Sequence, residues 1–426
     1  MLFFYNLLLP LGILCFLPGL WWKYRHRPGW KETFGERFGR FSPERAEELK
    51  AWHGAVWIHA VSVGEAVAAL SLIRAWQRRF PGRRFVVSTT TTTGQELVRK
   101  QAPEGVAAIF CPIDMRRYVR RAFDVVRPAM LAIFETEIWP NLVVEAAARQ
   151  VPLALVNARM SDHSVRGYRR VRCFMAPLLE RFSLIAAQSE QDAARFRSIA
   201  PKAAVETLGN LKFDQSVPAE LKAADLSVYF GPGAVVLLAG STHPGEEKLI
   251  IDCWRELAAA HPELKLVIVP RHAERGDEIA ALLTAAGVSF CRRSRGETPA
   301  AGKTVPVVLA DTTGEMLALM KSADIVIMGK SLAGQDEGHN LIEPALLDKP
   351  IVTGAVLRNF RFVLEVLKQA DAVATVPHDE DLGAVLEPLV ADADRRRELG
   401  ARAGAAIRRH AGAVERTVER LDALLP

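Results

Sequence analysis

Short apolar, β-branched segments alternate with longer amphipathic segments along most of this chain. After residue 50, apolar runs fall at 55–58, 84–89, 107–110, 130–134, 153–157 and 184–188. A second series follows at 235–239, 264–269, 307–309, 325–328 and 351–353. Stretches of helical periodicity, such as 65–79 and 94–101, separate the runs. This alternation predicts two successive α/β units, each built on a mostly parallel sheet.

A break in the pattern marks the boundary between the two units. The segment 216–233 contains Pro218 and a Gly-Pro-Gly sequence at 231–233, a composition typical of linkers. We therefore expect a first domain over 23–215 and a second domain over 234–426 that ends in a C-terminal helix. In two Rossmann-like domains of this kind, the ligand is expected in a central cleft at the carboxyl ends of the strands.

The first 22 residues form an almost wholly apolar block, about the length that crosses a bilayer as a helix. A basic cluster at 23–31 follows, and the basic start and small-residue cleavage site of a signal peptide are both missing. The positive charge on the C-terminal side predicts a membrane anchor over 1–22, with the rest of the chain in the cytoplasm. A buried or interfacial helix is the alternative, because Pro10 and Pro18 favour a shallow or re-entrant segment.

Composition narrows the class of protein. The chain has 426 residues, of which 50% are hydrophobic and 24% charged, so it is long enough for two folded domains and is not disordered. Lys and Arg number 55 against 49 Asp and Glu, a net charge of +6 that suits anionic ligands but is too small for a nucleic-acid coat. Five scattered cysteines without a CxxC pair indicate a reducing compartment and no zinc site.

The first unit contains candidate catalytic residues, two regions of them at strand ends and one near the expected linker. Glu65 lies in WIHAVSVGEA (57–66), where a strand turns into a helix, and suits either a general base for an alcohol or a carboxylate that complements the helix dipole. Glu135 and Glu137 follow the strand at 130–134, and Glu135 is the first choice for a catalytic role, with or without an ion pair to Arg159. Lys212, in GNLKFD, either reaches an anionic group or is an ordinary solvated lysine.

In the second series, three strand ends carry groups that bind anions. The turn at 239–247 (AGSTHPGEE) combines glycine and hydroxyl residues before a helix, although Ser241 and Thr242 are equally explained as helix caps. Arg271 ends another strand, and backbone amides of Gly314, Glu315 and Met316 begin a helix after a third. Their convergence predicts a nucleotide site. The spacing of a P-loop is missing, which argues against an ATPase.

The loop at 329–345 leads into a helix that carries Asn340 and Glu343 on one face. The amide can bond a base or phosphate, and the carboxylate can accept from ribose hydroxyls; a helix cap with a solvated acid is the plainer interpretation. A metal site made of acidic residues and His339 in this loop matches no standard ligand spacing, so we expect no metal.

Together these motifs resemble one family. The chain is similar throughout to the 3-deoxy-D-manno-octulosonic acid (Kdo) transferases, membrane-anchored glycosyltransferases of lipid A and lipopolysaccharide assembly with the GT-B architecture. The motifs that carry the resemblance are RFGR (37–40), HAVSVGE (59–65), ETEIWPN (135–141), NARMS (157–161), GNLKFD (209–214), PRH (270–272), GEM (314–316) and GHNxxEP (338–344).

The resemblance implies an inverting transfer of Kdo from CMP-Kdo to a tetra-acylated lipid A precursor at the cytoplasmic face of the bacterial inner membrane. It implies no metal or other cofactor. Glu65 would be the base in an acceptor-binding first domain, with Glu135 and Lys212 stabilising the transition state. The second domain would hold CMP through Pro270, Arg271, Gly314, Glu315, Met316, Asn340 and Glu343.

Two alternatives stay open. One is a membrane-associated GT-B glycosyltransferase that uses another nucleotide sugar, such as a UDP-hexosamine. The other is an anchored binding protein without catalytic activity, which the position of Glu65 at a helix start disfavours.

Overall fold

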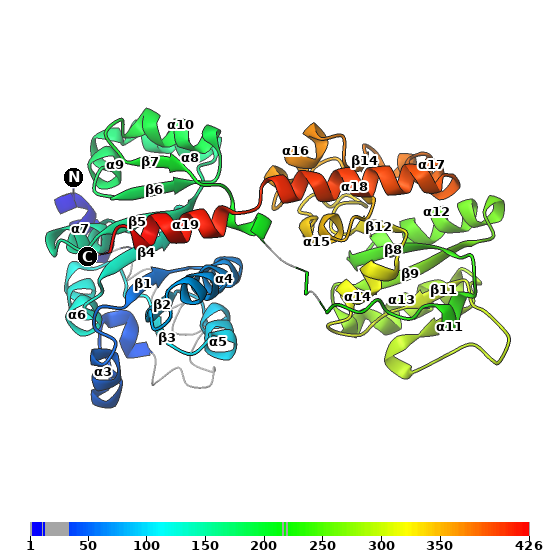
Figure 1. Ribbon diagram of the computed structural model, residues 1–426, viewed down its shortest axis with the longest axis horizontal. Helices are drawn as coiled ribbons and strands as arrows, with labels where there is room; N and C mark the ends of the chain where they lie inside the picture. Colours follow the sequence, from blue (N-terminus) through cyan, green and yellow to red (C-terminus); the bar gives the residue numbers. More distant parts are fainter. Residues whose placement is uncertain (1, 11, 13–33, 215–216, 219, 426) are drawn as a thin grey trace. The chain divides into compact units, whose positions relative to one another are not determined.

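The structure is a computed structural model that describes residues 2–10, 12, 34–214, 217–218 and 220–425. It divides into two compact units, one made of Met1–Asp214 with Ala411–Pro426, the other of Gln215–His410 (Figure 1). Most of the expected anchor, residues 1, 11 and 13–22, lies outside the described residues. Within the described part of the chain, no helix combines the length and apolar character needed to cross a membrane.

The first unit is built on a seven-stranded parallel sheet with the order β3-β2-β1-β4-β5-β6-β7. Its strands are buried, which suits near-continuous apolar sequences covered on both faces. The strands are β1 (Val56–His59), β2 (Phe85–Thr89), β3 (Val106–Phe110), β4 (Met130–Phe134), β5 (Leu153–Ala158), β6 (Leu184–Ala187) and β7 (Val205–Thr207).

Helices cover both faces of this sheet and form two apolar cores. One core contains buried side chains of α4 and α19, and the other contains side chains of α6, α7 and α9. The helices of the unit are η1 (Gly35–Phe38), α3 (Pro43–Lys50), α4 (Val63–Arg79), α5 (Thr92–Gln101), α6 (Arg116–Val126), α7 (Pro140–Ala148), α8 (Asp162–Arg170), α9 (Arg172–Leu179), α10 (Glu190–Ile199), η2 (Leu211–Asp214) and α19 (Ala413–Asp422).

The second unit repeats the plan with the strand order β10-β11-β9-β8-β12-β13-β14, again all parallel. The strands are β8 (Val235–Thr242), β9 (Leu264–Pro270), β10 (Phe290–Arg292), β11 (Val307–Leu309), β12 (Ile325–Met328), β13 (Ile351–Gly354) and β14 (Ala374–Val376). The helices are α11 (Ser227–Phe230), α12 (Glu246–Ala260), η3 (Ala273–Arg275), α13 (Gly276–Ala285), η4 (Arg293–Arg295), α14 (Met316–Ser322), α15 (Ile342–Leu346), α16 (Arg361–Gln369), η5 (Asp379–Asp381), α17 (Leu382–Ala391) and α18 (Ala393–Arg409).

The predicted fold class, two Rossmann-like α/β units, is therefore confirmed. Every strand predicted from the apolar runs is present, within a few residues at each end. The sequence did not reveal β7, β10 and β14, which have three residues each and lie at the ends of the sheets. Each contains polar or only partly buried residues, so it lacks the continuous apolar sequence that revealed β11, which is equally short.

The last helix corrects the predicted domain boundary. We expected 234–426 to form one domain, but Ala411–Pro426 belongs to the first unit. The reason is the apolar face of α19, whose Val418 and Leu421 are fully buried in the core that contains α4. Nε1 of Trp76 on α4 also donates to Asp422 Oδ1 at 2.8 Å. The chain thus passes from one unit to the other twice.

The expected linker is also shorter than predicted. Positions 216 and 219 lie outside the described residues, but α11 falls inside 216–233 and belongs to the second unit. Its carbonyl at Tyr229 accepts a hydrogen bond from the amide of Val305 at 3.0 Å, and the amide of Ala224 donates to Ala318 at 3.0 Å. These contacts fix residues 224–230 against the second sheet's helices and loops.

Candidate functional site

Glu65 holds the turn that follows β1. The Ser62 hydroxyl oxygen accepts from the Glu65 amide at 3.2 Å, and the hydroxyl donates back to Glu65 Oε1 at 2.7 Å. The amide of Val61 donates to Oε2 at 2.9 Å. The helix-start role is therefore real, and it fixes the carboxylate in one orientation. Each carboxylate oxygen can accept more than one hydrogen bond, so the group keeps acceptor capacity for a substrate hydroxyl.

Glu135 lies at the end of β4, the parallel neighbour of β1. Nε of Arg159 donates to Glu135 Oε2 at 3.1 Å, and Nζ of Lys212 lies 3.9 Å from Oε1. The structure thus brings two predicted site residues together, and it also contains the ion pair to Arg159 that was the alternative. The backbone of Glu135 has a φ of 55°, a strained value that is common where a side chain must be aimed at a site.

Glu137 adds a third carboxylate to this edge of the sheet. Burial raises its pKa, and the negative charges of Glu65 and Glu135 raise it further. Three acidic side chains therefore interact here, and the one with the raised pKa holds a proton more readily than an exposed carboxyl. We call Glu65, Glu135 and Glu137 the carboxylate cluster. An electrostatically coupled group of this kind is typical of a site that moves protons.

A chain of amide side chains positions Lys212. Asn157 Oδ1 accepts from the amide of Leu211 at 3.1 Å, and the Asn157 carbonyl accepts from Gln188 Nε2 at 2.8 Å. Asn210 Nδ2 donates to Gln188 Oε1 at 3.0 Å, while Asn210 Oδ1 accepts from the amide of Lys212 at 3.0 Å. The NARMS and GNLKFD motifs are therefore joined, and Gln188 links them without having been singled out in the sequence.

The RFGR motif supports the turn that carries Glu65. Arg37 donates through Nη2 to the carbonyl of Thr90 at 2.8 Å, and its guanidinium lies 4.2 Å from the ring centroid of Phe110. Thr90 in turn donates its hydroxyl to the carbonyl of Val61 at 3.3 Å. The motif therefore braces the loop between β1 and α4 from the ends of β2 and β3.

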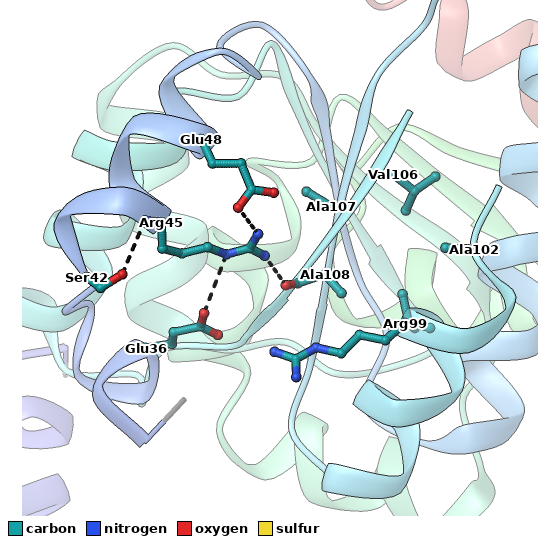
Figure 2. A pocket seen from close by; sticks show the side chains of 10 residues that line it. Glu36, Ser42, Arg45, Glu48, Arg99, Ala102, Val106, Ala107 and Ala108 are labelled. Atoms are coloured by element: carbon teal, nitrogen blue, oxygen red, sulfur yellow. Dashed lines mark hydrogen bonds and ion pairs between the residues drawn. The ribbon is translucent and has the colours of Figure 1, made fainter. Parts of the chain in front are cut away.

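A cavity of about 450 Å³ beside β3 is a structural feature and lies apart from the carboxylate cluster. Figure 2 shows Arg45 from α3 between Glu36, Glu48 and the carbonyl of Ala108. The Glu36 carboxylate, 4% exposed, accepts from the amide of Phe110 at 2.8 Å. These contacts cover the exposed backbone of an edge strand, which limits pairing with other chains.

In the second unit, β8 and β9 end side by side. Pro270 is paired with Thr242, and the amide of Arg271 donates to the Thr242 carbonyl at 3.0 Å. This places Pro270 and Arg271 next to the turn that follows β8. The Arg271 side chain is exposed and free to meet a ligand.

Two histidines that were not among the predicted nucleotide-binding residues occupy the same region. Nε2 of His243 lies 2.9 Å from Nε2 of His339, and the two rings stack with their centroids 5.2 Å apart. Burial and, after it, the positive charges of Arg271 and Lys330 together lower the pKa of His339 to about 4. The pKa of His243 is lowered as well, first by burial. Both rings are therefore neutral near pH 7, among cations that suit an anion.

Glu246 explains the turn that looked like a phosphate loop. Its carboxylate is fully buried and accepts hydrogen bonds from the amide of His243 at 2.9 Å and from three amides after β12. Those amides belong to Lys330, Ser331 and Leu332, at 2.8, 2.9 and 3.0 Å. A carboxylate of the chain itself thus ties this turn to the loop after β12, and so places His243 and Lys330 near each other.

The other predicted nucleotide residues have internal partners. Glu315 pairs with Arg293 Nη2 at 2.5 Å, and this contact lowers its pKa. Met316 begins α14, and its Sδ would lie 3.3 Å from a Cβ added to Gly240 near the end of β8. Gly314 has a φ of 88°, which glycine adopts without strain. The predicted GEM segment therefore borders β8 through Met316.

Asn340 and Glu343 lie at the start of α15. Asn340 Oδ1 accepts from the amide of Ile342 at 3.1 Å, so the helix-cap interpretation is present in the structure. Glu343 is half-buried, and burial raises its pKa while its contact with Asn340 lowers it. Asn340 directly follows His339, which places the pair beside the imidazoles. Among the residues that the structure describes, no group of three or more His, Cys, Asp and Glu side chains is arranged to hold a metal ion.

Solved structures define the class of fold. The chain is similar to the glycotransferase of kitacinnamycin, with a TM-score of 0.55 and 14% identity over 88% of this chain and 100% of that one. It is also similar to the UDP-GlcNAc 2-epimerase of Neisseria meningitidis bound to UDP-GlcNAc, with a TM-score of 0.56 and 14% identity over 86% and 99%. The two parallel α/β units are those of the GT-B architecture.

Sequence comparison identifies the family. The family model described as 3-deoxy-D-manno-octulosonic-acid transferase (kdotransferase) matches residues 32–215. The 3-deoxy-D-manno-octulosonic acid transferase of Haemophilus influenzae is 32% identical over 99% of this chain and 98% of its own. The enzyme of the same name from Bordetella pertussis is 33% identical over 95% of each chain. The chain belongs to the Kdo transferase family and is a glycosyltransferase, as its motifs indicated.

Proposed function

We propose that the protein transfers Kdo from CMP-Kdo to a tetra-acylated lipid A precursor, with inversion at the anomeric carbon. The observation that carries this proposal is the arrangement at the carboxyl edge of the first sheet. There the fixed carboxylate of Glu65 and the carboxylate of Glu135 both interact with Glu137, and Glu135 contacts Lys212. Membership in the Kdo transferase family supports the sugar and the type of reaction.

In the proposed reaction Glu65 accepts the proton of the acceptor hydroxyl as that oxygen attacks the anomeric carbon of Kdo. The new bond forms between the acceptor oxygen and the anomeric carbon. The bond from that carbon to the phosphate oxygen breaks, and CMP leaves with the electron pair. Attack on the face opposite the phosphate inverts the configuration. Glu135 complements the positive charge that develops on the sugar ring, and Lys212 complements the anionic groups of the substrates.

The departing phosphate needs positive groups, which the second unit supplies. Arg271 is exposed beside the end of β8, and the positive charges of Arg271 and Lys330 both act on the neutral imidazole of His339. These groups stabilise growing negative charge without a metal or another cofactor. We therefore propose that transfer is unaffected by a chelator such as EDTA.

The described N-terminal helix supports a location at the cytoplasmic face of the inner membrane. Within residues 2–10, Tyr5 and Asn6 bond to the first unit, whereas four large apolar side chains point elsewhere. These are Phe3, Phe4, Leu7 and Leu8, with exposed fractions of 72, 63, 56 and 61%. Arg116 and Arg117 line a groove with Leu2 and Phe3. Apolar side chains next to cations are typical of a surface that enters an anionic membrane interface.

The test is the mass of the lipid product. Detergent-solubilised protein is incubated with a system that generates CMP-Kdo and with the tetra-acylated precursor, and the lipid is analysed by mass spectrometry. A gain of one or more Kdo units supports the proposal and counts the transfers. Protein that binds CMP but adds no Kdo contradicts it, and a hexosamine added from a UDP-sugar would establish the alternative donor.

A further inference from the structure

Asp114 joins three separate elements of the first unit. It follows β3, is 3% exposed, and accepts three hydrogen bonds. The Tyr5 hydroxyl donates to Oδ2 at 2.8 Å, and the amides of Asn141 and Leu142 donate to Oδ2 and Oδ1 at 2.9 Å each. These amides lie in the first turn of α7, where backbone donors have no partner within the helix. Trp139, at the N-cap position, provides no side-chain cap.

Asp114 therefore caps α7 from another element, and α7 directly follows the carboxylate loop, residues 135–139. This loop is under two kinds of stress. Glu135 has a left-handed backbone, a strained conformation that persists only when its surroundings hold it. The carboxylates of Glu65 and Glu135 also repel that of Glu137.

The loop is held at both ends. At its start, the amide of Glu135 donates to the carbonyl of Val156 at 2.8 Å, as part of the sheet. At its end, the first turn of α7 is bound to Asp114. A change at Asp114 frees the second end, so the strain at Glu135 can relax and the carboxylates can move apart.

The N-terminal helix reaches this same point. Besides the bond from Tyr5 to Asp114, Nδ2 of Asn141 donates to Asn6 Oδ1 at 2.7 Å. The Tyr5 ring also lies 6.2 Å from the ring of Phe174 on α9. Residues 5 and 6 thus bind both Asp114 and the first turn of α7, while the neighbouring apolar side chains stay exposed.

We propose that Asp114 is a positioning residue for Glu135 and Glu137, and that Tyr5 strengthens its hold. The N-terminal helix then has a second role besides contact with a membrane, because its docking on Asp114 sets the geometry of the carboxylate cluster. This inference rests on the proposed function for the reaction that it affects. The hold of Asp114 on the first turn of α7 can be measured without any reaction.

The experiment compares Asp114→Asn, Tyr5→Phe and the double variant with the wild type, with the acceptor in detergent micelles so that membrane binding plays no part. Misplacement of catalytic groups should lower kcat about tenfold in Asp114→Asn and about threefold in Tyr5→Phe, with the KM for CMP-Kdo within about twofold. Because both residues act through one carboxylate, the double variant should be about as slow as Asp114→Asn alone. The matched controls are Asp124→Asn and Tyr118→Phe, both on α6. Asp124 is exposed and forms an ion pair with Arg149.

Hydrogen exchange supplies the second readout. Amides of residues 135–142 should exchange faster in Tyr5→Phe than in the wild type, while those of β1 stay unchanged. Three results would overturn the inference. They are a normal kcat in both single variants, an effect on KM alone, and independent effects on kcat that multiply in the double variant. A wild-type protein that transfers no Kdo refutes the proposed function instead. Unchanged hydrogen exchange at residues 135–142 in Tyr5→Phe refutes the positioning role of Asp114 separately.

Discussion

Nε2 of His243 and Nε2 of His339 lie 2.9 Å apart, so one nitrogen must donate a hydrogen and the other must accept it. Two neutral rings can share one hydrogen in this way, but two charged rings cannot. The charged groups around His339 are Arg271, Lys330 and Glu337, and those around His243 are Lys330, His272, Arg275 and Glu247. Burial is the main cause that lowers the pKa of both rings, and the cations, which outweigh the carboxylates here, lower it further.

Binding of CMP should therefore be accompanied by uptake of a proton. A phosphate offsets the surrounding positive charge, which raises the pKa of the imidazoles from their lowered values, about 4 for His339. The affinity of the wild type for CMP should therefore rise as the pH falls from 8 to 7. The affinity of His339→Gln should rise less. Calorimetry in two buffers of different ionisation enthalpy measures the uptake at pH 7. Equal uptake by the wild type and by His339→Gln, with both binding CMP, would refute this role.

Removal of the Glu246 carboxylate should destabilise the second unit. Glu246→Ala leaves four amide donors, two of them buried and two partly buried, without their acceptor, at a cost of about 3 kcal/mol or more. Glu256→Ala, an exposed position on the same helix, is the control and should change stability by less than about 0.5 kcal/mol. Urea unfolding of the two variants gives the comparison. Equal stabilities would mean that the amides find other partners.

Loss of an apolar side chain from α19 should destabilise the first unit, although the helix follows the second one in sequence. Leu421 is fully buried in the core with α4, and Leu421→Ala should cost about 2–5 kcal/mol. Glu419→Ala, exposed on the same helix, should have little effect. Hydrogen exchange localises the change: β1 and α4 should lose protection and β8 should not. Loss of protection in β8 alone would contradict the assignment of α19.

The stability of the first unit should depend on the protonation of Asp114. Burial raises its pKa from 3.8 to about 6, so the folded state binds this proton more tightly than the unfolded state does. The stabilisation of the folded state by this tighter proton binding is fully present below about pH 4. It is lost as the pH rises through 6, a change of about 3 kcal/mol in the free energy of unfolding. The difference in unfolding free energy between the wild type and Asp114→Asn should therefore shift in favour of the wild type as pH falls from 7 to 4. A constant difference would show that Asp114 does not titrate there.

The strand pattern predicted both sheets because fully covered parallel strands need continuous apolar sequence, as in 130–134. The same reasoning placed α19 in the wrong unit. An amphipathic helix shows in its sequence that it must cover something, but not which sheet it covers. The decisive contacts, from Trp76 and Asp214 to residues after 411, join positions more than 190 apart. Such pairings cannot be read from local periodicity.

At the site, sequence reasoning found residues that follow strands but could not assign their partners. The ion pair of Glu135 with Arg159, which the sequence left open as an alternative, is present, because parallel neighbouring strands end together. His243 and His339 were missed as a pair, since they lie 96 positions apart and neither has a ligand spacing of its own. Glu246 looked like part of a phosphate loop because a buried carboxylate and a bound anion use the same amides.

The most direct test of the account is Kdo transfer by Glu65→Gln. Glutamine keeps the capping interaction with Ser62 but cannot accept a proton at neutral pH, so the fold should persist. Product lipid is quantified by mass spectrometry for the wild type, for Glu65→Gln and for the exposed control Glu96→Gln, and CMP affinity is measured for each. We predict that Glu65→Gln loses about 10²- to 10⁴-fold in rate with unchanged CMP affinity, while the control matches the wild type. Undiminished transfer by Glu65→Gln would contradict its role as the base.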